Sequence, residues 1–486
     1  MTMTETRKPR RFKTRHLSMI ALGSAIGAGF FLGTGQAIAS AGPAVLVSYL
    51  IAALIAITVM YSLAELSAAL PSTGSFSTYA EAGIGRWAGF TVGWMYWFML
   101  IMVLGMEITG AAQIFVQWFP AVPQWVVALV IVVVLGGVNL LAAGDFGEVE
   151  AWLAGIKVAA IIMFLLIGVG LLIGFIPGKT APVMETVLGN GGFAPLGMAG
   201  IATGLLAIIT SFGGIEIVTI AAAEAEDPQR AMSKAIRSVL WRILVFYVGS
   251  VILLICLLPW NSPDMVLNPF ATVLNMAGIP AVGRIMEIIV FVALVSAFSA
   301  NVYSSSRMAY SLCARGMGSP WLLGGSATAS DSPDALAHVV TGDSKRDLEA
   351  VMAEETAVGD IARGRTPRRA VSLSVILALV SVGLNWWLPE AILGILINAI
   401  GMVLLIAWVF IIISQIRLRP LLRENHDLPI RMPGWPWTGY LALAGLAVMG
   451  VLMALSPSAR PQLISMLGLM LIIMGIYWIR EKLARR

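Results

Sequence analysis

The sequence predicts an all-α membrane protein with about twelve transmembrane helices, and three observations support this fold class. Of its 486 residues, 59% are hydrophobic and only 12% are charged, whereas about 25% of the residues in a soluble domain are charged. The apolar residues form long runs, and about 20 residues suffice for a helix to cross the hydrocarbon core of a bilayer. The positive residues lie mostly between these runs, in the pattern that sets membrane orientation.

Each apolar run is expected to form one helix, because a chain in lipid must satisfy its backbone hydrogen bonds internally. The runs also lack the polar–apolar alternation of a membrane β-barrel. The expected spans are residues 17–39, 44–70, 87–117, 124–143, 151–176, 196–224, 237–258, 282–314, 369–388, 390–416, 436–455 and 461–479. An even number of spans places both termini on the same side of the membrane.

The Lys and Arg residues indicate the orientation. If the N-terminus is cytoplasmic, all but three of the 31 Lys and Arg residues fall on or toward the inside, and the exceptions are Lys179, Arg284 and Arg460. Positive residues favour the cytoplasmic side. We therefore expect a multi-pass protein of the cell (inner or plasma) membrane with both termini cytoplasmic. The net charge of +5 reflects this orientation, and no nucleic-acid partner is expected.

The expected spans divide the chain into four parts. A basic cytoplasmic tail occupies 1–16, a ten-span core 17–418, two further spans 436–480, and a short cytoplasmic tail 481–486. A polar insertion at 323–366 interrupts the core, with eight acidic and four basic residues. It is either a tolerated cytoplasmic loop or a surface for a cytoplasmic regulator.

The cysteines and histidines indicate no metal site. Cys256 and Cys313 lie in apolar runs, and the three histidines lie in separate polar segments. This spacing supports neither a disulfide framework nor a zinc site. No cofactor is therefore expected.

The first span has five glycines in the run LGSAIGAGFFLGTG. Each destabilises a helix by about 1 kcal/mol relative to alanine. A GxxxG packing face would explain Gly23 and Gly27, whereas a helix broken near Gly27–Gly29 explains more of the pattern. Broken backbone at membrane depth is tolerated where it lines a cavity, and its free N–H and C=O groups can bind a carboxylate and an ammonium.

The sixth span has a matching interruption. Gly213 and Gly214 lie in TSFGGIEIVTIAAAEAEDP, and the carboxylate of Glu216 follows directly. Spans 1 and 6 are five apart, and interrupted spans at corresponding positions of two halves indicate an inverted-repeat transporter. The sequence therefore predicts a transport site at the two breaks.

Two further ionisable residues lie deep within spans, where such residues cost about 2.5–3.5 kcal/mol and are functional by default. Glu107 lies in span 3, and we expect it on the transport pathway because its short side chain does not reach water easily. Lys157 lies about two turns into span 5. It either serves transport or extends its amine to the inner surface.

Four residues are candidates for a polar path or gate. Glu65, Glu224 and Arg307 are expected near the cytoplasmic side, as structural ion pairs or as an inner gate. Ser299 belongs to a polar face of span 8, in VSAFSANVYSSSRMAYSL. That face either forms hydrogen bonds with neighbouring helices or lines an ion or substrate path.

Together these motifs resemble the amino acid–polyamine–organocation (APC) superfamily, specifically bacterial permeases for GABA, aromatic amino acids and proline. The resemblance covers most of residues 15–320, and spans 9–12 match more loosely. The 323–366 insertion departs from the family. The matching strings are LGSAIGAGFFLGTG, AGPAVLVSYLIAALIAITVMYSLAEL, STGSFSTYAEAGIGRWAGFTVGWMYW, SFGGIEIVTIAAAEAEDP, SVLWRILVFYVGS with the following LPWN, and SSSRMAYSL.

The resemblance implies a LeuT-like core, a five-plus-five inverted repeat, with two added C-terminal helices. It also implies import of an amino acid with protons. Phe212 would be an aromatic lid, and Lys157 would couple transport to protons, at the position where sodium-coupled relatives hold a sodium ion. The residues implied at the substrate are Ser24, Ala25, Ile26, Gly27, Ala28, Gly29, Glu107, Phe212, Gly213, Gly214 and Glu216.

Other function classes stay open at this stage. One is an exchanger of amino acids and amines without proton coupling, and another is a non-transporting receptor that uses the 323–366 insertion. No catalytic constellation is present, so an enzyme is not expected. The transported substrate could be GABA, proline, an aromatic amino acid or another neutral or zwitterionic amino acid.

Overall fold

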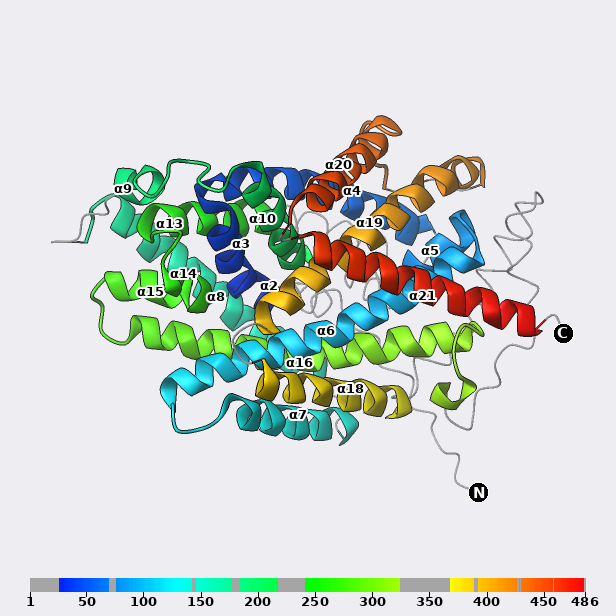
Figure 1. The fold of residues 1–486 in the computed structure, drawn as a ribbon, viewed down its shortest axis with the longest axis horizontal. Helices are drawn as coiled ribbons and strands as arrows, with labels where there is room; N and C mark the ends of the chain where they lie inside the picture. The colour runs from blue at the N-terminus through cyan, green and yellow to red at the C-terminus, as the bar shows by residue number, and fades with distance from the viewer. Residues whose placement is uncertain are drawn as a thin grey trace, which may run out of the picture.

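The computed structural model shows a bundle of α-helices, without a β-strand in its described residues (Figure 1). The predicted N-terminal tail and nearly all of the 323–366 insertion lie outside the described residues. The structure describes residues 26–69, 76–141, 146–176, 183–214, 216, 241–323, 368–388, 392–425, 428, 430–457 and 459–484.

Every predicted span has helical structure at its position. The first five spans are α2 (Ala28–Phe31) with α3 (Gly33–Ala41), α4 (Val45–Ala69), α6 (Arg86–Trp118), α7 (Gln124–Leu141) and α8 (Phe146–Leu172). The next five are α10 (Gly197–Phe212), the π-helical turn η2 (Arg242–Val248) with α13 (Gly249–Leu257), α16 (Val282–Ala314), α18 (Arg368–Trp387) and α19 (Ile392–Asn425). The last two are α20 (Trp437–Leu455) and α21 (Arg460–Ala484).

The lengths of these helices agree with membrane crossing. Eight segments of the described chain are long and apolar enough to span a bilayer, and one of them, Ala28–Ala69, contains the first two predicted spans. Three shorter apolar helices, at Gln124–Leu140, Gly197–Phe212 and Val245–Leu257, account for the rest. The predicted all-helical membrane fold is therefore confirmed.

Short helices occupy connections that the sequence treated as loops. They are η1 (Gly42–Ala44), α5 (Phe76–Gly83), α9 (Val183–Leu188), α14 (Pro263–Leu267), α15 (Pro269–Met276) and η3 (Pro320–Leu323). Helix α5 connects spans 2 and 3, whereas α14 and α15 connect spans 7 and 8, and Figure 1 shows them at opposite ends of the bundle. The helices that follow, α6 and α16, both have 33 residues. The two halves thus repeat one order of elements in opposite orientations.

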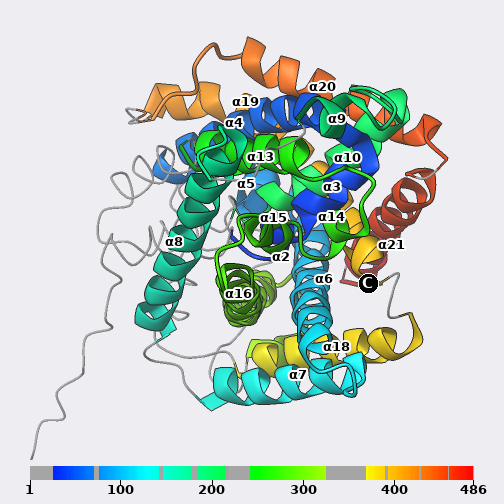
Figure 2. The same ribbon diagram turned by 90° about the vertical axis from the view of Figure 1, so that its left-hand side faces the viewer.

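The broken first span lies inside the bundle, and Figure 2 shows α2 and α3 surrounded by α6, α10 and α16. Glycines permit this close packing. A Cβ atom at Gly29 would lie 2.6 Å from the Thr210 carbonyl oxygen, and one at Gly33 would lie 3.0 Å from the Ser211 hydroxyl oxygen. The Ser211 hydroxyl also donates a hydrogen bond to the Gly29 carbonyl. Spans 1 and 6 are therefore joined at their breaks.

Candidate substrate site

The first span is interrupted at Gly27, where the sequence predicted a break. Gly27 has extended backbone angles (φ −133°, ψ −150°), and α2 begins at the next residue, Ala28. The N–H groups at the start of a helix have no intrahelical acceptor. Glu107, on α6, accepts the Ala28 N–H, with N···O distances of 3.2 Å to Oε1 and 3.1 Å to Oε2. A buried carboxylate thus binds the free donor at the break.

The sixth span ends in a second break. Helix α10 stops at Phe212, and Gly214 has a φ of +98°, a left-handed conformation that favours glycine. The Glu216 carboxylate is fully buried here. It accepts the Gly214 N–H at 3.0 Å and the Trp408 indole N–H, from α19, at 2.6 Å. Glu216 therefore holds the break against α19.

A cavity of about 40 Å³ lies between the two breaks. This volume holds on the order of one or two water molecules, whereas sites for small molecules measure about 300–1,000 Å³. The helices must therefore separate to admit an amino acid. The cavity is lined by Gly27, Gly29, Tyr96, Met99, Leu100, Val103, Met106, Glu107, Thr210, Gly213, Gly214, Asn301, Ile400 and Leu404.

Four polar side chains contribute to this mostly apolar lining. Besides Glu107, the Thr210 hydroxyl donates to the Ile397 carbonyl at 2.7 Å, and the Asn301 amide donates to the Ala297 carbonyl at 2.9 Å. The Tyr96 hydroxyl is buried beside the Glu216 carboxylate and interacts with it. Tyr96 thus connects α6 to the second break.

The structure brings together part of the predicted substrate set. Five of its members line the cavity: Gly27, Gly29, Glu107, Gly213 and Gly214. Three others, Ile26, Ala28 and Glu216, are buried in the two breaks without belonging to the lining. Ser24 and Ala25 lie outside the described residues.

The predicted aromatic lid, Phe212, packs away from the lining in this conformation. Its ring stacks on that of Tyr247, with centroids 5.2 Å apart and an interplanar angle of 11°. The ring of Tyr49 meets it edge-on at 6.1 Å. Phe212 thus joins an aromatic cluster beside the site, and its role as a lid stays a prediction.

Lys157 is buried on α8, with 1% of its surface exposed. Its side chain therefore does not extend to the protein surface. The alternative in which Lys157 extends its amine to the inner surface is not supported. Lys157 is not among the residues that line the cavity. A role for Lys157 in proton coupling stays a prediction.

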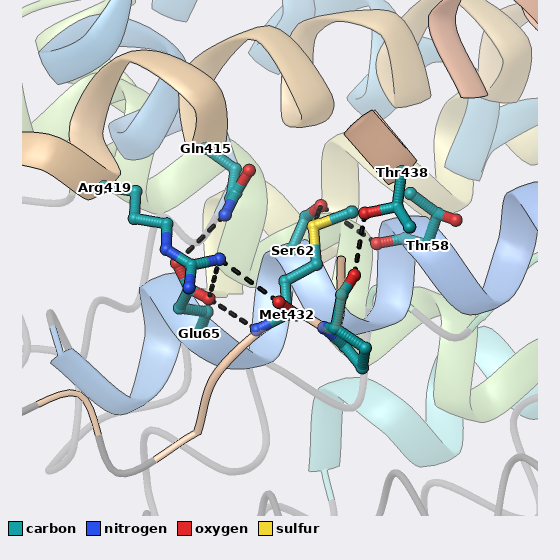
Figure 3. Close-up of polar contacts among 8 residues, drawn as sticks. Thr58, Ser62, Glu65, Gln415, Arg419, Met432 and Thr438 are labelled. Atoms are coloured by element: carbon teal, nitrogen blue, oxygen red, sulfur yellow. Dashed lines mark hydrogen bonds and ion pairs between the residues drawn. The ribbon is translucent and has the colours of Figure 1, made fainter. Parts of the chain in front are cut away.

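Glu65 lies in a polar cluster that joins three segments (Figure 3). Its carboxylate is fully buried, forms an ion pair of 3.2 Å with Arg419, and accepts the Gln415 amide at 2.9 Å and the Met432 N–H at 2.7 Å. The Arg419 guanidinium also lies 4.7 Å from the ring centroid of Trp435. The cluster ties α4 to α19 and to the segment that leads into α20.

The other predicted gate residues lie apart from the cavity lining. Ser299 accepts a hydrogen bond of 3.2 Å from the Asn139 amide of α7, which is an interhelical contact. The Arg307 guanidinium lies 5.1 Å from the ring centroid of Tyr303. Glu224 lies outside the described residues.

One buried ion pair was missed by sequence reasoning. Arg315, after α16, donates to the Glu81 carboxylate at 2.8 Å and to the Ser77 hydroxyl at 2.6 Å, and the Arg315 and Glu81 side chains are each 1% exposed. Glu81 lies on α5, in a connection between two spans without a long apolar run that would predict burial. The pair joins α5 to the end of α16.

Two interrupted spans around a small cavity that contains a buried carboxylate define a membrane transporter of the inverted-repeat class. Residues 16–326 and 349–486 match the amino acid permease family, and the chain belongs to that family. The predicted resemblance to the APC superfamily is thereby confirmed, and the chain is a transporter rather than an enzyme.

The similar proteins are named for several different substrates. The chain is 45% identical to an aromatic amino acid transport protein of Corynebacterium glutamicum, covering 93% of this chain and 91% of the relative. It is 35% identical to the gamma-aminobutyric acid permease of Bacillus subtilis (96% and 92% covered) and 34% identical to the L-asparagine permease of Escherichia coli (97% and 88% covered).

A solved structure shares the fold. A variant of the manganese transporter of Eremococcus coleocola has a TM-score of 0.53 at 15% identity, covering 97% of this chain and 94% of that one. At this identity the likeness shows the fold alone.

Proposed function

We propose that this permease imports an amino acid by proton symport, and that the substrate carboxylate binds the Ala28 N–H that Glu107 accepts in this conformation. The supporting observation is the contact itself. A carboxylate already lies 3.1–3.2 Å from the free N–H of the first break. Free N–H groups of broken helices bind anionic substrate groups in inverted-repeat transporters. Glu107 thus occupies the place of the substrate carboxylate.

The cargo in this proposal is a zwitterionic amino acid with a large uncharged side chain. Most side chains of the cavity lining are apolar, and six of them come from α6 and α19: Met99, Leu100, Val103, Met106, Ile400 and Leu404. Apolar walls favour an apolar side chain, because they offer no partner to a charge. The similarity to an aromatic amino acid transport protein makes aromatic amino acids the first candidates, ahead of proline and GABA.

Coupling to protons in this proposal requires Lys157. A membrane-buried ionisable residue marks a substrate or proton pathway by default, and Lys157 is 1% exposed in the middle of the described part of α8. Its amine can take up and release a proton in successive states of the transporter. The residue would thereby supply the positive charge that a bound cation supplies elsewhere.

Orientation is also part of the proposal. Arg86 at the start of α6, Arg480 near the end of α21, and Arg417 and Arg419 on α19 lie toward one end of the bundle. This end is proposed to face the cytoplasm of the cell, with both termini, because positive residues favour that side.

Uptake by purified protein in proteoliposomes tests the function. An inward proton gradient should drive accumulation of a labelled aromatic amino acid, and a protonophore should abolish it. Uptake that depends on a sodium gradient but not on a proton gradient would contradict proton symport. Counterflow that requires internal substrate and does not change with pH would instead support the exchanger. A panel of unlabelled amino acids, with proline and GABA included, would rank the cargo by competition.

A further inference from the structure

A second, larger cavity lies outside the transport site. It is a groove of about 630 Å³ between α6, the segment after α16, and α21. Its volume falls within the range of about 300–1,000 Å³ that is typical of small-molecule sites. The groove is lined by Phe90, Trp94, Trp97, Phe98, Met317, Gly318, Ser319, Pro320, Leu469, Ile473, Ile476 and Arg480.

Arg480 is the one charged residue among the residues that line this groove. Arg480 donates to the Met317 carbonyl at 2.8 Å and to the Gly316 carbonyl at 3.1 Å, and its guanidinium lies 5.8 Å from the ring centroid of Phe90. These contacts hold the guanidinium at the groove while the residue stays exposed. They involve only neutral groups, so its positive charge is available to an anion.

Two tryptophans of α6 form part of the groove wall. The rings of Trp94 and Trp97 meet edge-on at a centroid distance of 5.2 Å, and the Trp94 indole donates to the Met317 carbonyl at 2.9 Å. This hydrogen bond holds the Trp94 ring against the segment that follows α16.

The groove lies at an end of the bundle that carries several basic residues. Its α6 residues follow closely on Arg86, where the helix begins, and Arg480 is followed by Lys482 near the end of α21. Figure 1 shows α5 and the end of α21 at the same end of the bundle. Basic residues at the cytoplasmic surface attract anionic lipids. Under the proposed orientation, the groove therefore opens toward the anionic leaflet.

We propose that this groove binds one acyl chain of an anionic phospholipid, with the phosphate beside Arg480. Helix α21 forms one wall of the groove and is exposed along most of its apolar length, so in a membrane it would contact lipid, and a lipid chain is the expected occupant. The guanidinium selects the anionic headgroup, since arginine pairs strongly with phosphate. Tryptophan is enriched where membrane proteins contact lipid headgroups, which agrees with Trp94 and Trp97 in the groove wall.

Native mass spectrometry of the purified full-length protein tests the proposal, with phosphatidylglycerol and phosphatidylcholine of matched chains added in turn. Phosphatidylglycerol should be retained about fivefold better, the factor that one basic side chain contributes near an anionic surface. Arg480→Gln should remove this preference, and Arg480→Lys should keep most of it. Arg460→Gln is the matched control, because Arg460 lies at the other end of the same helix and also donates to backbone carbonyls.

A second variant keeps the test decisive if Arg480→Gln does not fold. Ile473→Trp should fill the groove and lower retention of both lipids, while substrate uptake persists. Equal retention of the two lipids by the unaltered protein would overturn the proposal, as would full retention of the preference in Arg480→Gln. A dimer that Ile473→Trp dissociates would also overturn it, because a second copy of the chain would then be the occupant.

Discussion

Both carboxylate oxygens of Glu107 lie within 3.2 Å of the Ala28 nitrogen, although the two residues are 79 positions apart. A Cβ atom at Gly27 would lie 2.5 Å from Glu107 Oε1, so the glycine leaves just enough room for this contact. The free donor of the broken span is thus satisfied by the protein itself. A substrate carboxylate must displace Glu107 to bind there.

Replacing Glu107 by glutamine should raise the affinity for the substrate. The charged carboxylate competes with the substrate carboxylate for the Ala28 N–H, and a hydrogen bond to a charged acceptor is stronger than one to a neutral acceptor. The neutral amide of Glu107→Gln should be displaced more easily, so KM should fall by about fivefold, which corresponds to about 1 kcal/mol. Initial rates of uptake at one fixed pH measure KM for both proteins.

Glu287→Gln provides the control for this comparison. Glu287 pairs with the exposed Arg284 at 3.1 Å, far from the cavity lining. Its KM should equal that of the unaltered protein. A Glu107→Gln variant with an unchanged KM would remove Glu107 from substrate binding.

A methyl group at position 27 should impair transport without preventing folding. Gly27→Ala places a Cβ atom 2.5 Å from Glu107 Oε1 and 3.2 Å from the Ala297 Cβ, which shifts the groups proposed to bind the substrate. We expect kcat/KM for uptake to fall about tenfold or more, as small misplacements in a site do. Gly137→Ala on α7 is the control, because its Cβ would meet nothing within 4 Å. Equal uptake by both variants would contradict the close fit at Gly27.

Lys157→Ala should separate coupling from transport. The variant should lose accumulation driven by a proton gradient, because the buried amine is gone, but should retain counterflow of labelled against unlabelled substrate. Counterflow also shows that the variant is folded. Accumulation at the original level would exclude Lys157 from the coupling mechanism.

Arg419→Ala should destabilise the protein more than it alters affinity. Removing one partner of a buried ion pair costs about 3–5 kcal/mol, and we expect about 2–3 kcal/mol because the Arg419 side chain is 13% exposed. The Tm of the purified protein should therefore fall by several degrees. Arg417→Ala is the neighbouring control, with a single exposed contact of 3.4 Å to the Gly83 carbonyl. A Tm equal to that control would show that the Glu65 cluster contributes little.

The spans and both breaks could be predicted because each has a strong local signal. The apolar run at 282–314 coincides with α16, Val282–Ala314. Glycines disfavour a continuous helix whatever the fold around them. Gly27 and Gly213 could therefore be identified as break positions from the sequence alone.

The cavity walls and the partners of buried charges could not be predicted. Met99 and Leu100 lie eight and seven residues before Glu107, on the same face of α6, but an apolar side chain there fits a helix contact as well as a cavity wall. The contact of Trp408 with Glu216 joins residues 192 positions apart, and Arg315 and Glu81 are similarly distant. Such pairs depend on how the helices pack, which periodicity alone does not specify.

The most direct test is a cryo-electron microscopy structure with the preferred amino acid bound. The account predicts that the substrate carboxylate lies within hydrogen-bond distance of the Ala28 nitrogen and that Glu107 has moved out of that distance. A substrate bound elsewhere, with Glu107 still 3.1–3.2 Å from the Ala28 nitrogen, would contradict it.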